Sequence, residues 1–397
     1  MSLARVKALK LHNFRNAEKA EYEFSDGLIF ITGNNGAGKT TILEAIGLIS
    51  FLKSFRSALD RDMIKSGASF FRVEADFLTT DAHRIAISYG RNPGDLSAAL
   101  AKKYAFDGRQ NEKAANIIGR VPSVVLSPDD MRIIAGDHAE RRRFLDLLLS
   151  MLYPAYFAAL QHYQRALKLR SQALKSRPDE GVLMAVDREL AQAGVEILEK
   201  RRQFIPEFAT PFSENVAKIS SGSDAWLIQY KGDTSAVKTR DDYLAMLKEH
   251  RANDLRLRQT TGGIHRDRIF FTQGGDTEPG RPSAIRGSAD GAVSSGNRIP
   301  SVPQEIRTVG SQGQKRTAAL ALKMAQFSYM RAKLNATPVL LIDDILNELD
   351  LKRRASFIDF LGAGNVGQVF FTTTDLIGMQ DFLKTLRQSA PVQNIEL

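Results

Sequence analysis

The sequence predicts an α/β protein with a mixed β-sheet, antiparallel at its N-terminal end, and a helical second lobe. Three observations carry this prediction. Strand patterns alternate with helical patterns at both ends of the chain, residues 137–208 place apolar side chains at helical spacing, and 43% hydrophobic with 25% charged residues is typical of globular proteins. The 397 residues correspond to two or three domains, enough for a large core.

The N-terminal third is expected to form strands around one helix. Alternating and apolar runs predict strands at 6–11, near 22–24, at 28–31 and, as an antiparallel meander, between 70 and 89. A helix is predicted from Thr40 to about Phe51. We therefore assign residues 1–120 to the first part of an α/β head.

The middle of the chain is predicted to be mainly helical, with helices at 137–175 and 182–208 inside a lobe of residues 121–260. Residues 261–397 return to the head, with a helix from Ser311 to about Leu334, a strand at 339–342, a further helix, and a strand at 368–373. Between them, residues 273–305 hold six Gly, four Pro and five Ser, and are expected to form a mobile insertion.

Charge and composition narrow the classes of function. Lys and Arg exceed Asp and Glu by 55 − 45 = 10, and this excess favours a polyanionic partner such as nucleic acid. The absence of Cys excludes disulfides and thiolate metal sites and fits a reducing compartment. The N-terminus lacks a signal-peptide pattern and the longest apolar stretch, 147–160, is too short to cross a bilayer. We expect a cytoplasmic protein without a membrane partner.

Residues 33–40 match the phosphate-loop pattern G-x-x-x-x-G-K-[ST] between an apolar strand and a helix. The loop backbone and the helix N-terminus suit phosphate oxygens, Lys39 is expected to reach the β and γ phosphates, and Thr40 is expected to ligate Mg²⁺. The predicted nucleotide contacts are Gly33, Asn34, Asn35, Gly36, Ala37, Gly38, Lys39, Thr40 and Thr41.

A second motif is the apolar run 339–342 followed by Asp343 and Asp344. Carboxylates at the end of a buried parallel strand face the ligand crevice of such sheets. Asp343 is expected to hold Mg²⁺, directly or through water, and Asp344 to orient or deprotonate the attacking water, which makes Asp344 and Lys39 the predicted catalytic residues.

Residues 311–314, Ser-Gln-Gly-Gln, open a predicted helix. Ser311 and Gln314 have the spacing of a capping box, which is one interpretation. The other is a second anion site, with Gly313 allowing close approach of a phosphate. Together with the phosphate loop and the strand carboxylates, this helix start points to an ABC-type ATPase, a class of P-loop NTPase.

The chain resembles the RecF family of recombination-mediator ATPases, whose head is of the ABC type and similar to that of SMC proteins. The resembling segments run in family order along nearly the whole chain, and they are 11–16 (LHNFRN), 33–45, 53–56 (KSFR), 126–131 (LSPDDM), 141–146 (RRRFLD), 265–267 (HRD), 311–317 (SQGQKRT), 341–350 (LIDDILNELD) and 372–374 (TTT).

This resemblance implies a DNA repair, replication and recombination protein of the DNA-damage (SOS) response that binds ATP with Mg²⁺. It implies an ATP-dependent homodimer on DNA, with a preference for duplex next to single-stranded gaps, slow DNA-stimulated ATP hydrolysis, and recombinase loading with RecR and RecO partners. Arg15 would contact a nucleotide phosphate, with a solvated arginine as the alternative. Ser311, Gly313 and Gln314 would meet the nucleotide of the partner subunit.

Some positions depart from the ABC pattern. Asp344 stands where related ABC ATPases place a catalytic Glu, and Thr374 where they place a switch His; both suggest slow turnover. No Gln occurs between Lys39 and Gln110, so residues 127–131 are a candidate for the place of the Q-loop, with plain helix capping as the alternative.

Three consecutive cations, 141–143, fall in the first turns of a predicted helix, where the helix dipole disfavours them. Pairing of Arg142 or Arg143 with Asp146 is one explanation; contact with DNA or ATP phosphates is the other, and Arg141 and Arg142 are the predicted DNA contacts. The cations at 168, 170 and 200–202 are expected to lie on solvated helix faces.

Three other functions stay open from the sequence. An SMC-like or RecN-like repair ATPase would carry long coiled-coil arms, which the short helical patterns here lack. An ATP-binding subunit of a membrane transporter fits poorly with the positive charge and with Thr374. A DNA clamp that binds ATP without hydrolysing it would be separated from the main prediction by a phosphate-release assay.

Overall fold

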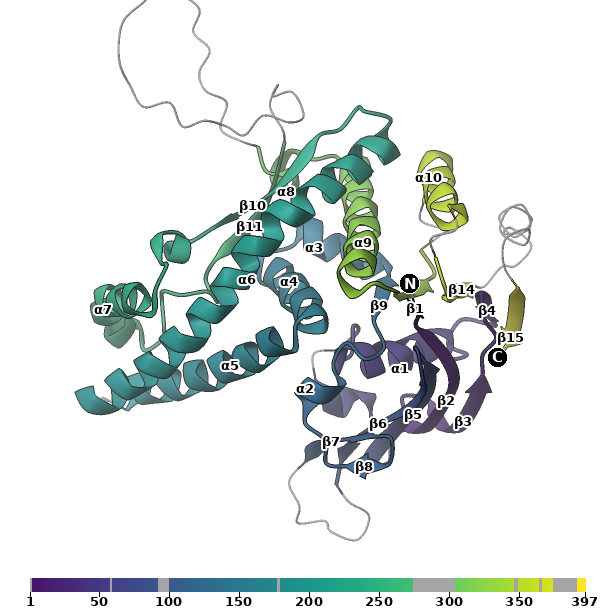
Figure 1. The fold of residues 1–397 in the computed structure, drawn as a ribbon, viewed down its shortest axis with the longest axis horizontal. Helices are drawn as coiled ribbons and strands as arrows, with labels where there is room; N and C mark the ends of the chain where they lie inside the picture. Colours follow the sequence, from purple (N-terminus) through teal and green to yellow (C-terminus); the bar gives the residue numbers. More distant parts are fainter. Residues whose placement is uncertain are drawn as a thin grey trace, which may run out of the picture.

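The chain folds into a head with two sheets and an extended helical lobe (Figure 1). The computed structural model describes residues 2–57, 59–91, 100–176, 179–273, 304–345, 349–363, 366–373 and 391–397. In that part of the chain no helix is both long and apolar enough to cross a membrane.

The first sheet of the head is parallel throughout, with strand order β15-β4-β14-β13-β9. Its central strands are unbroken apolar runs and are buried on both faces, as expected for a parallel sheet covered by helices. The strand bounds are β4 Leu28–Thr32, β9 Ser123–Leu126, β13 Val339–Asp343, β14 Val369–Thr373 and β15 Val392–Glu396.

The second sheet is antiparallel, with order β3-β2-β5-β6-β7-β8. Buried and half-buried residues alternate along β5, so one face of the sheet packs on the core. The bounds are β2 Arg5–Phe14, β3 Ala17–Glu23, β5 Phe70–Leu78, β6 Ala82–Gly90, β7 Ala101–Phe106 and β8 Arg109–Gln110; β1 Ser2–Leu3 pairs with β12 Ala336–Thr337.

Helix α1 (Lys39–Phe51) lies between the two sheets and contacts strands of both. All its residues except Thr40 are buried, because a helix with apolar residues on all sides is stable only inside a core. The helix therefore holds the phosphate loop at its N-terminus rigidly against the ends of β4 and β13.

The helical lobe is built on α6 (Glu180–Ser220), which packs antiparallel to α5 (Pro154–Lys175) and contacts α7 (Arg240–Leu257) and α9 (Gln312–Leu334). Strands β10 (Trp226–Lys231) and β11 (Arg268–Gln273) form an antiparallel pair beside it. The shorter elements are η1 Asp60–Met63, α2 Ala114–Ile117, η2 Pro128–Asp130, α3 Met131–Ala135, α4 His138–Leu152, η3 Asp233–Ala236, α8 Ile306–Val309 and α10 Leu351–Gly362.

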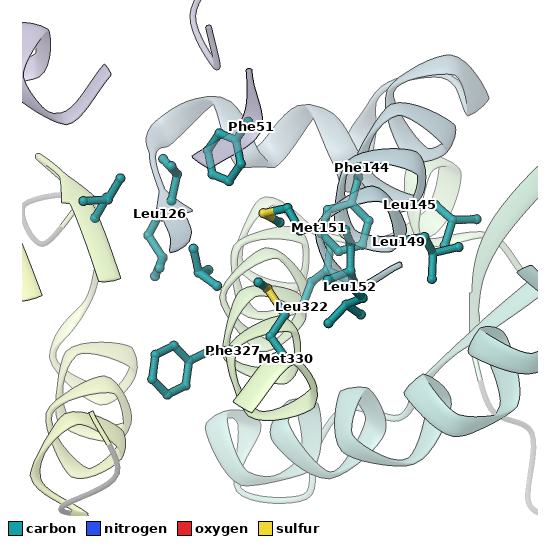
Figure 2. Close-up of a cluster of buried hydrophobic side chains, with 14 of the residues drawn as sticks. Phe51, Leu126, Phe144, Leu145, Leu149, Met151, Leu152, Leu322, Phe327 and Met330 are labelled. Carbon is teal, nitrogen blue, oxygen red and sulfur yellow. The ribbon is translucent and has the colours of Figure 1, made fainter. Parts of the chain in front are cut away.

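The head and the lobe share a core at α4 and α9. Figure 2 shows Phe144 and Leu149 of α4 gathered with Leu322 of α9, close to Phe51 and Leu126 of the head. All five side chains are at least 92% buried. The lobe is therefore attached to the head by packed apolar side chains.

The fold differs from the sequence prediction at these places. The predicted helix 182–208 runs on to Ser220 through Pro206 and Pro211, because its buried face continues through Phe212 and Val216. Strand β9, within the range predicted for the helical lobe, belongs to the parallel sheet of the head. Strand β15 was not predicted; its polar sequence pairs with β4 through the backbone at the sheet edge.

The predicted insertion 273–305 falls outside the described residues except at its ends. Gln273 and Gln304 are joined there by a backbone hydrogen bond of 2.9 Å, so the segment leaves and re-enters the fold at one place. Thr374 also falls outside the described residues.

Candidate nucleotide and cation site

The phosphate loop links β4 to α1 and has a backbone that requires glycine. Gly33, Gly36 and Gly38 have φ of 144°, 85° and 109°, a region that side-chain-bearing residues rarely adopt. Lys39 folds back over the loop, and its Nζ donates to the carbonyl oxygens of Gly33 and Asn34 at 2.7 and 2.9 Å. Its ammonium has no carboxylate partner among the described residues, as expected for a group that binds phosphate.

Thr40 and Asp343 meet at the mouth of this loop, although they are 303 residues apart in sequence. Thr40 Oγ1 donates to Asp343 Oδ1 at 2.8 Å, and Thr372 Oγ1 donates to the same oxygen at 2.8 Å. Burial raises the pKa of the Asp343 carboxyl above its usual value, and the two hydroxyl donors offset only part of this effect.

This arrangement fits a divalent cation. Asp343 is a half-buried carboxylate that forms no ion pair within the described residues, and its neighbours are hydroxyl oxygens. Hard oxygen ligands of this kind suit Mg²⁺. Thr40 and Asp343 could therefore hold Mg²⁺ beside a phosphate in the loop.

Asp344 follows the strand in a left-handed conformation, with φ of 48°. Its backbone N–H donates to Thr372 Oγ1 at 3.0 Å, and its side chain is exposed. Thr372 thus fixes both carboxylate residues, a role that the sequence analysis did not assign. The signal was present: Thr372 follows the apolar run of β14 and lies in register with Asp343.

Beneath the loop, the fully buried Glu44 of α1 forms the centre of a polar cluster. Arg15 Nε donates to Glu44 at 2.9 Å, Ser54 Oγ donates to it at 2.5 Å, and Arg56 lies 3.5 Å away. Arg15 is therefore paired within the protein here, and its contact with a nucleotide phosphate stays a prediction. Thr41 Oγ1 donates to the Asn16 side chain at 3.1 Å, next to the loop.

At the start of α9, the capping box predicted for Ser311 and Gln314 is formed, with both hydrogen bonds at 2.9–3.1 Å. Gln314 also donates to Asp224 at 2.9 Å, and the Gly313 carbonyl accepts from Arg353 at 2.6 Å. Ser311 is exposed. Capping is therefore present, and a second function at a partner's nucleotide stays a prediction.

Residues 127–131 also form a cap. The Asp130 carboxylate accepts from the Ser127 N–H at 2.8 Å and pairs with Lys323 of α9 at 2.8 Å. Helix capping is therefore present in this segment, and the place of the Q-loop stays a prediction.

The prediction that Arg141 contacts DNA is wrong. This side chain, predicted to contact DNA, is 1% exposed and donates to the carbonyls of Ile133, Ile134 and Ile269 and to Glu305. Its guanidinium is committed to acceptors inside the protein, so it is not available to DNA phosphates. Arg142 is half-buried and donates to the carbonyl of Asp267 at 2.6 Å; its contact with DNA stays a prediction.

The other explanation for the three cations, pairing of Arg142 or Arg143 with Asp146, was also wrong. Asp146 does not pair with Arg142 or Arg143; it accepts from Arg201 at 2.7 Å and from Tyr156. Arg201 and Arg170, expected on solvated faces, are 1% and 0% exposed. Their guanidinium groups link helices of the lobe.

A phosphate loop, a threonine and aspartate pair for a cation, a second carboxylate after the same strand and a Ser-Gln-Gly-Gln helix start define an ABC-type ATPase head. A family model described as "RecF/RecN/SMC N terminal domain" matches residues 5–390. The chain belongs to the RecF family.

Relatives support this membership over nearly the whole length. The DNA replication and repair protein RecF of Leptospira interrogans serovar Lai is 36% identical over 98% of this chain and 96% of its own. That of Leptospira biflexa serovar Patoc is 33% identical over 96% and 94%. A solved structure of "the recombination mediator protein RecF-ATP in RecFOR pathway" covers 96% of both chains at 26% identity, with a TM-score of 0.79.

Proposed function

We propose that the chain binds ATP with Mg²⁺, hydrolyses it slowly with stimulation by DNA, and dimerises on DNA in an ATP-dependent way. The observation that carries the proposal is the 2.8 Å contact of Thr40 with Asp343 at the mouth of the phosphate loop. It brings a phosphate cradle and a cation site together in a chain similar to an ATP-bound recombination mediator.

The roles of the residues follow from their positions. Lys39 and the loop N–H groups hold the β and γ phosphates, and Thr40 with Asp343 holds Mg²⁺, which when bound neutralises phosphate charge. Asp344, exposed beyond the strand and anchored through its N–H, orients the attacking water.

The second half of each site is proposed to come from the partner subunit. Ser311 is exposed at a capped helix start, where N–H groups and the helix dipole favour an anion. Two chains would then enclose two nucleotides, each between the loop of one subunit and the helix start of the other. We propose the same dimer as the DNA-bound form, on duplex beside single-stranded gaps.

The partners are proposed from the relatives. The solved neighbours are described as RecF of a RecFOR pathway, and this supports RecO-like and RecR-like partners for this chain. The net charge of +10 supports DNA as the polyanionic partner.

Substitution at Ser311 tests the proposal. Ser311→Arg adds bulk at the proposed subunit contact, whereas Ser311→Ala removes only the cap bond to Gln314, worth about 1 kcal/mol. Light scattering with ATP and Mg²⁺ should show a dimer for wild type and Ser311→Ala and a monomer that still binds ATP for Ser311→Arg.

Two results would contradict the proposal. A Ser311→Arg dimer in ATP would refute the arrangement across subunits, and a wild-type chain without phosphate release, with or without gapped DNA, would refute hydrolysis.

A further inference from the structure

Two adjoining cavities flank the first turns of α4, which lies between the head and the β10–β11 pair (Figure 1). One cavity of about 520 Å³ is lined by residues 53–56 of the head and by α4 and α5. The other, of about 850 Å³, is lined by β10, β11 and the segment 259–268. Ala139 and Arg142 line both, so the cavities form one path across α4, here called the α4 path.

The α4 path carries excess positive charge. Six of its lining cations form no ion pair with a carboxylate among the described residues, and five of the six are exposed, Arg142 being half-buried. These six are Lys53, Arg142, Arg143, Lys231, Arg266 and Arg268.

The carboxylates along the path do not balance these cations. Those of residues 129, 130 and 146 already pair with Arg132, Lys323 and Arg201. Asp137 caps α4 by accepting from the N–H groups of residues 139 and 140. Because these N–H groups are neutral, Asp137 keeps its charge, so three carboxylates, Asp137, Glu140 and Asp233, remain against six cations and the path is suited to a polyanion.

The size and lining of the first cavity favour a single strand over a duplex. A volume of 520 Å³ corresponds to a cube about 8 Å on a side. A duplex is wider than its own major groove, which is about 12 Å across, so it does not fit into a space of this size. The half-buried rings of Phe55 and Phe157 line it beside the cations. Unpaired bases stack on aromatic rings while cations follow the backbone.

We propose that the α4 path binds a single strand of nucleic acid, with phosphates on the six cations and unpaired bases against Phe55 and Phe157. The proposal rests on the DNA binding proposed above and assigns the single-stranded arm of the DNA to this surface.

The wall of the path is joined to the nucleotide site. Arg143 donates to the Ser54 carbonyl at 3.4 Å, and the Ser54 hydroxyl donates to Glu44 of α1, the helix that begins at Lys39. A strand held at residues 53–56 therefore lies two contacts away from the helix that carries the phosphate loop.

The test compares two triple variants of the full chain that lose the same charge. The path variant is Lys53→Ala, Arg143→Ala and Arg268→Ala; the control is Lys218→Ala, Arg240→Ala and Lys248→Ala, three exposed cations that line neither cavity. Fluorescence anisotropy with ATP and Mg²⁺ measures binding of labelled oligo-dT and of a duplex of equal length over a salt series.

The path variant should lose about two units of the slope of log affinity against log salt for oligo-dT, since each single-strand phosphate contributes about 0.7. Its duplex affinity should stay that of wild type, and the control should keep the wild-type slope. If the path variant unfolds below the assay temperature, Arg143→Ala alone should lose about 0.7 units.

The other outcomes separate the two proposals. An equal loss in the control, an unchanged slope in the path variant, or an equal loss of duplex affinity overturns the assignment of a single strand to the α4 path, while DNA binding stands. A wild-type chain that binds neither DNA overturns the proposed DNA function itself.

Discussion

At the nucleotide site of the head, the charged groups face the open end of the parallel sheet, whereas in the helical lobe the buried charged groups face one another. Lys39 is buried and Asp343 half-buried, yet among the described residues their partners are only carbonyl and hydroxyl oxygens. In the lobe, Arg170 of α5 pairs with Asp187 of α6 and Asp254 of α7, each at 2.6 Å. We infer that charged side chains without an ionic partner indicate a ligand site. Buried ion pairs such as those of Arg170 instead connect helices of the fold.

The first prediction tests the buried ion pairs of Arg170 and has the largest expected effect. Arg170→Ala leaves the buried Asp254 of α7 without its cation and leaves the buried Asp187 of α6 with Arg251 alone. Removing one partner of a buried ion pair costs about 3–5 kcal/mol, so the free energy of unfolding in urea should fall by about that amount.

Lys168 provides the control for Arg170, since it is on the same helix but exposed and without an ion pair among the described residues. Lys168→Ala should change the free energy of unfolding by less than about 0.5 kcal/mol. A cost for Arg170→Ala as small as that of Lys168→Ala would show that the lobe does not depend on its buried charges.

The second prediction concerns the ligand site. Lys39→Ala removes a cation whose only partners in the described part of the chain are two carbonyl oxygens, so stability should change by no more than about 1 kcal/mol. ATP affinity, measured by calorimetric titration, should fall by about 10²-fold or more, because the phosphate charge loses its closest ammonium.

Lys19→Ala, a change at an exposed lysine on β3, serves as the control for Lys39→Ala and should alter neither property. If Lys39→Ala keeps wild-type ATP affinity, Lys39 is a structural residue and the distinction between the two regions fails.

The head was predictable from the sequence because its chemistry lies in short contiguous motifs. The phosphate loop and Asp343 each follow a recognisable apolar strand, and the carboxyl ends of parallel strands meet at one edge. Thr372 and Glu44 were not assigned because their roles depend on which strand and loop lie beside them.

The lobe was less predictable for a physical reason. Arg170 and Arg201 lie among exposed residues of amphipathic helices, where a cation is ordinarily solvated. Their burial depends on carboxylates and carbonyls contributed by distant segments, such as Asp254 and the Ile264 carbonyl. Local periodicity carries no information about such partners.

The third prediction uses a histidine of the lobe. Burial, opposed by the hydrogen bond to the Thr260 carbonyl and assisted by nearby arginines, lowers the pKa of His265 to about 4. Its Nδ1 lies 2.7 Å from the Tyr163 hydroxyl and its Nε2 3.2 Å from the Thr260 carbonyl, a pattern that fits the neutral ring with the proton on Nε2.

The unfolded chain takes up this proton near pH 6.5 and the folded chain only near pH 4, so stability falls as the pH drops through that window. From pH 7 to 5 the loss should be about 2 kcal/mol. Urea unfolding followed by the fluorescence of Trp226, the single tryptophan, measures it in the lobe. Over the same pH range, the loss of stability should be smaller by this amount in His265→Gln than in wild type. Parallel pH curves for the two proteins would contradict the prediction.

The last prediction concerns Thr372, the residue that joins the two carboxylates of the head. Thr372→Val keeps the shape of the side chain but removes the donor to Asp343 and the acceptor for the Asp344 N–H. Asp344 then loses the anchor of its left-handed backbone, so ATP turnover should fall about tenfold, equivalent to about 1.4 kcal/mol. ATP affinity should stay close to that of wild type, because Lys39 and the loop are unchanged.

Thr372→Ser decides between positioning and packing at this residue. Serine restores the hydroxyl but loses the methyl group, so it should recover most of the turnover even though it packs less well in the buried strand. If Thr372→Ser is as slow as Thr372→Val, the methyl group matters and Thr372 acts through packing. If both variants turn over ATP at the wild-type rate, the anchored backbone of Asp344 is not needed for hydrolysis. Thr372 is neutral and holds Asp343 and the Asp344 backbone by hydrogen bonds. Recovery by the hydroxyl alone would therefore show that hydrogen bonds position the charged groups of the nucleotide site, whereas ion pairs stabilise the buried charges of the lobe.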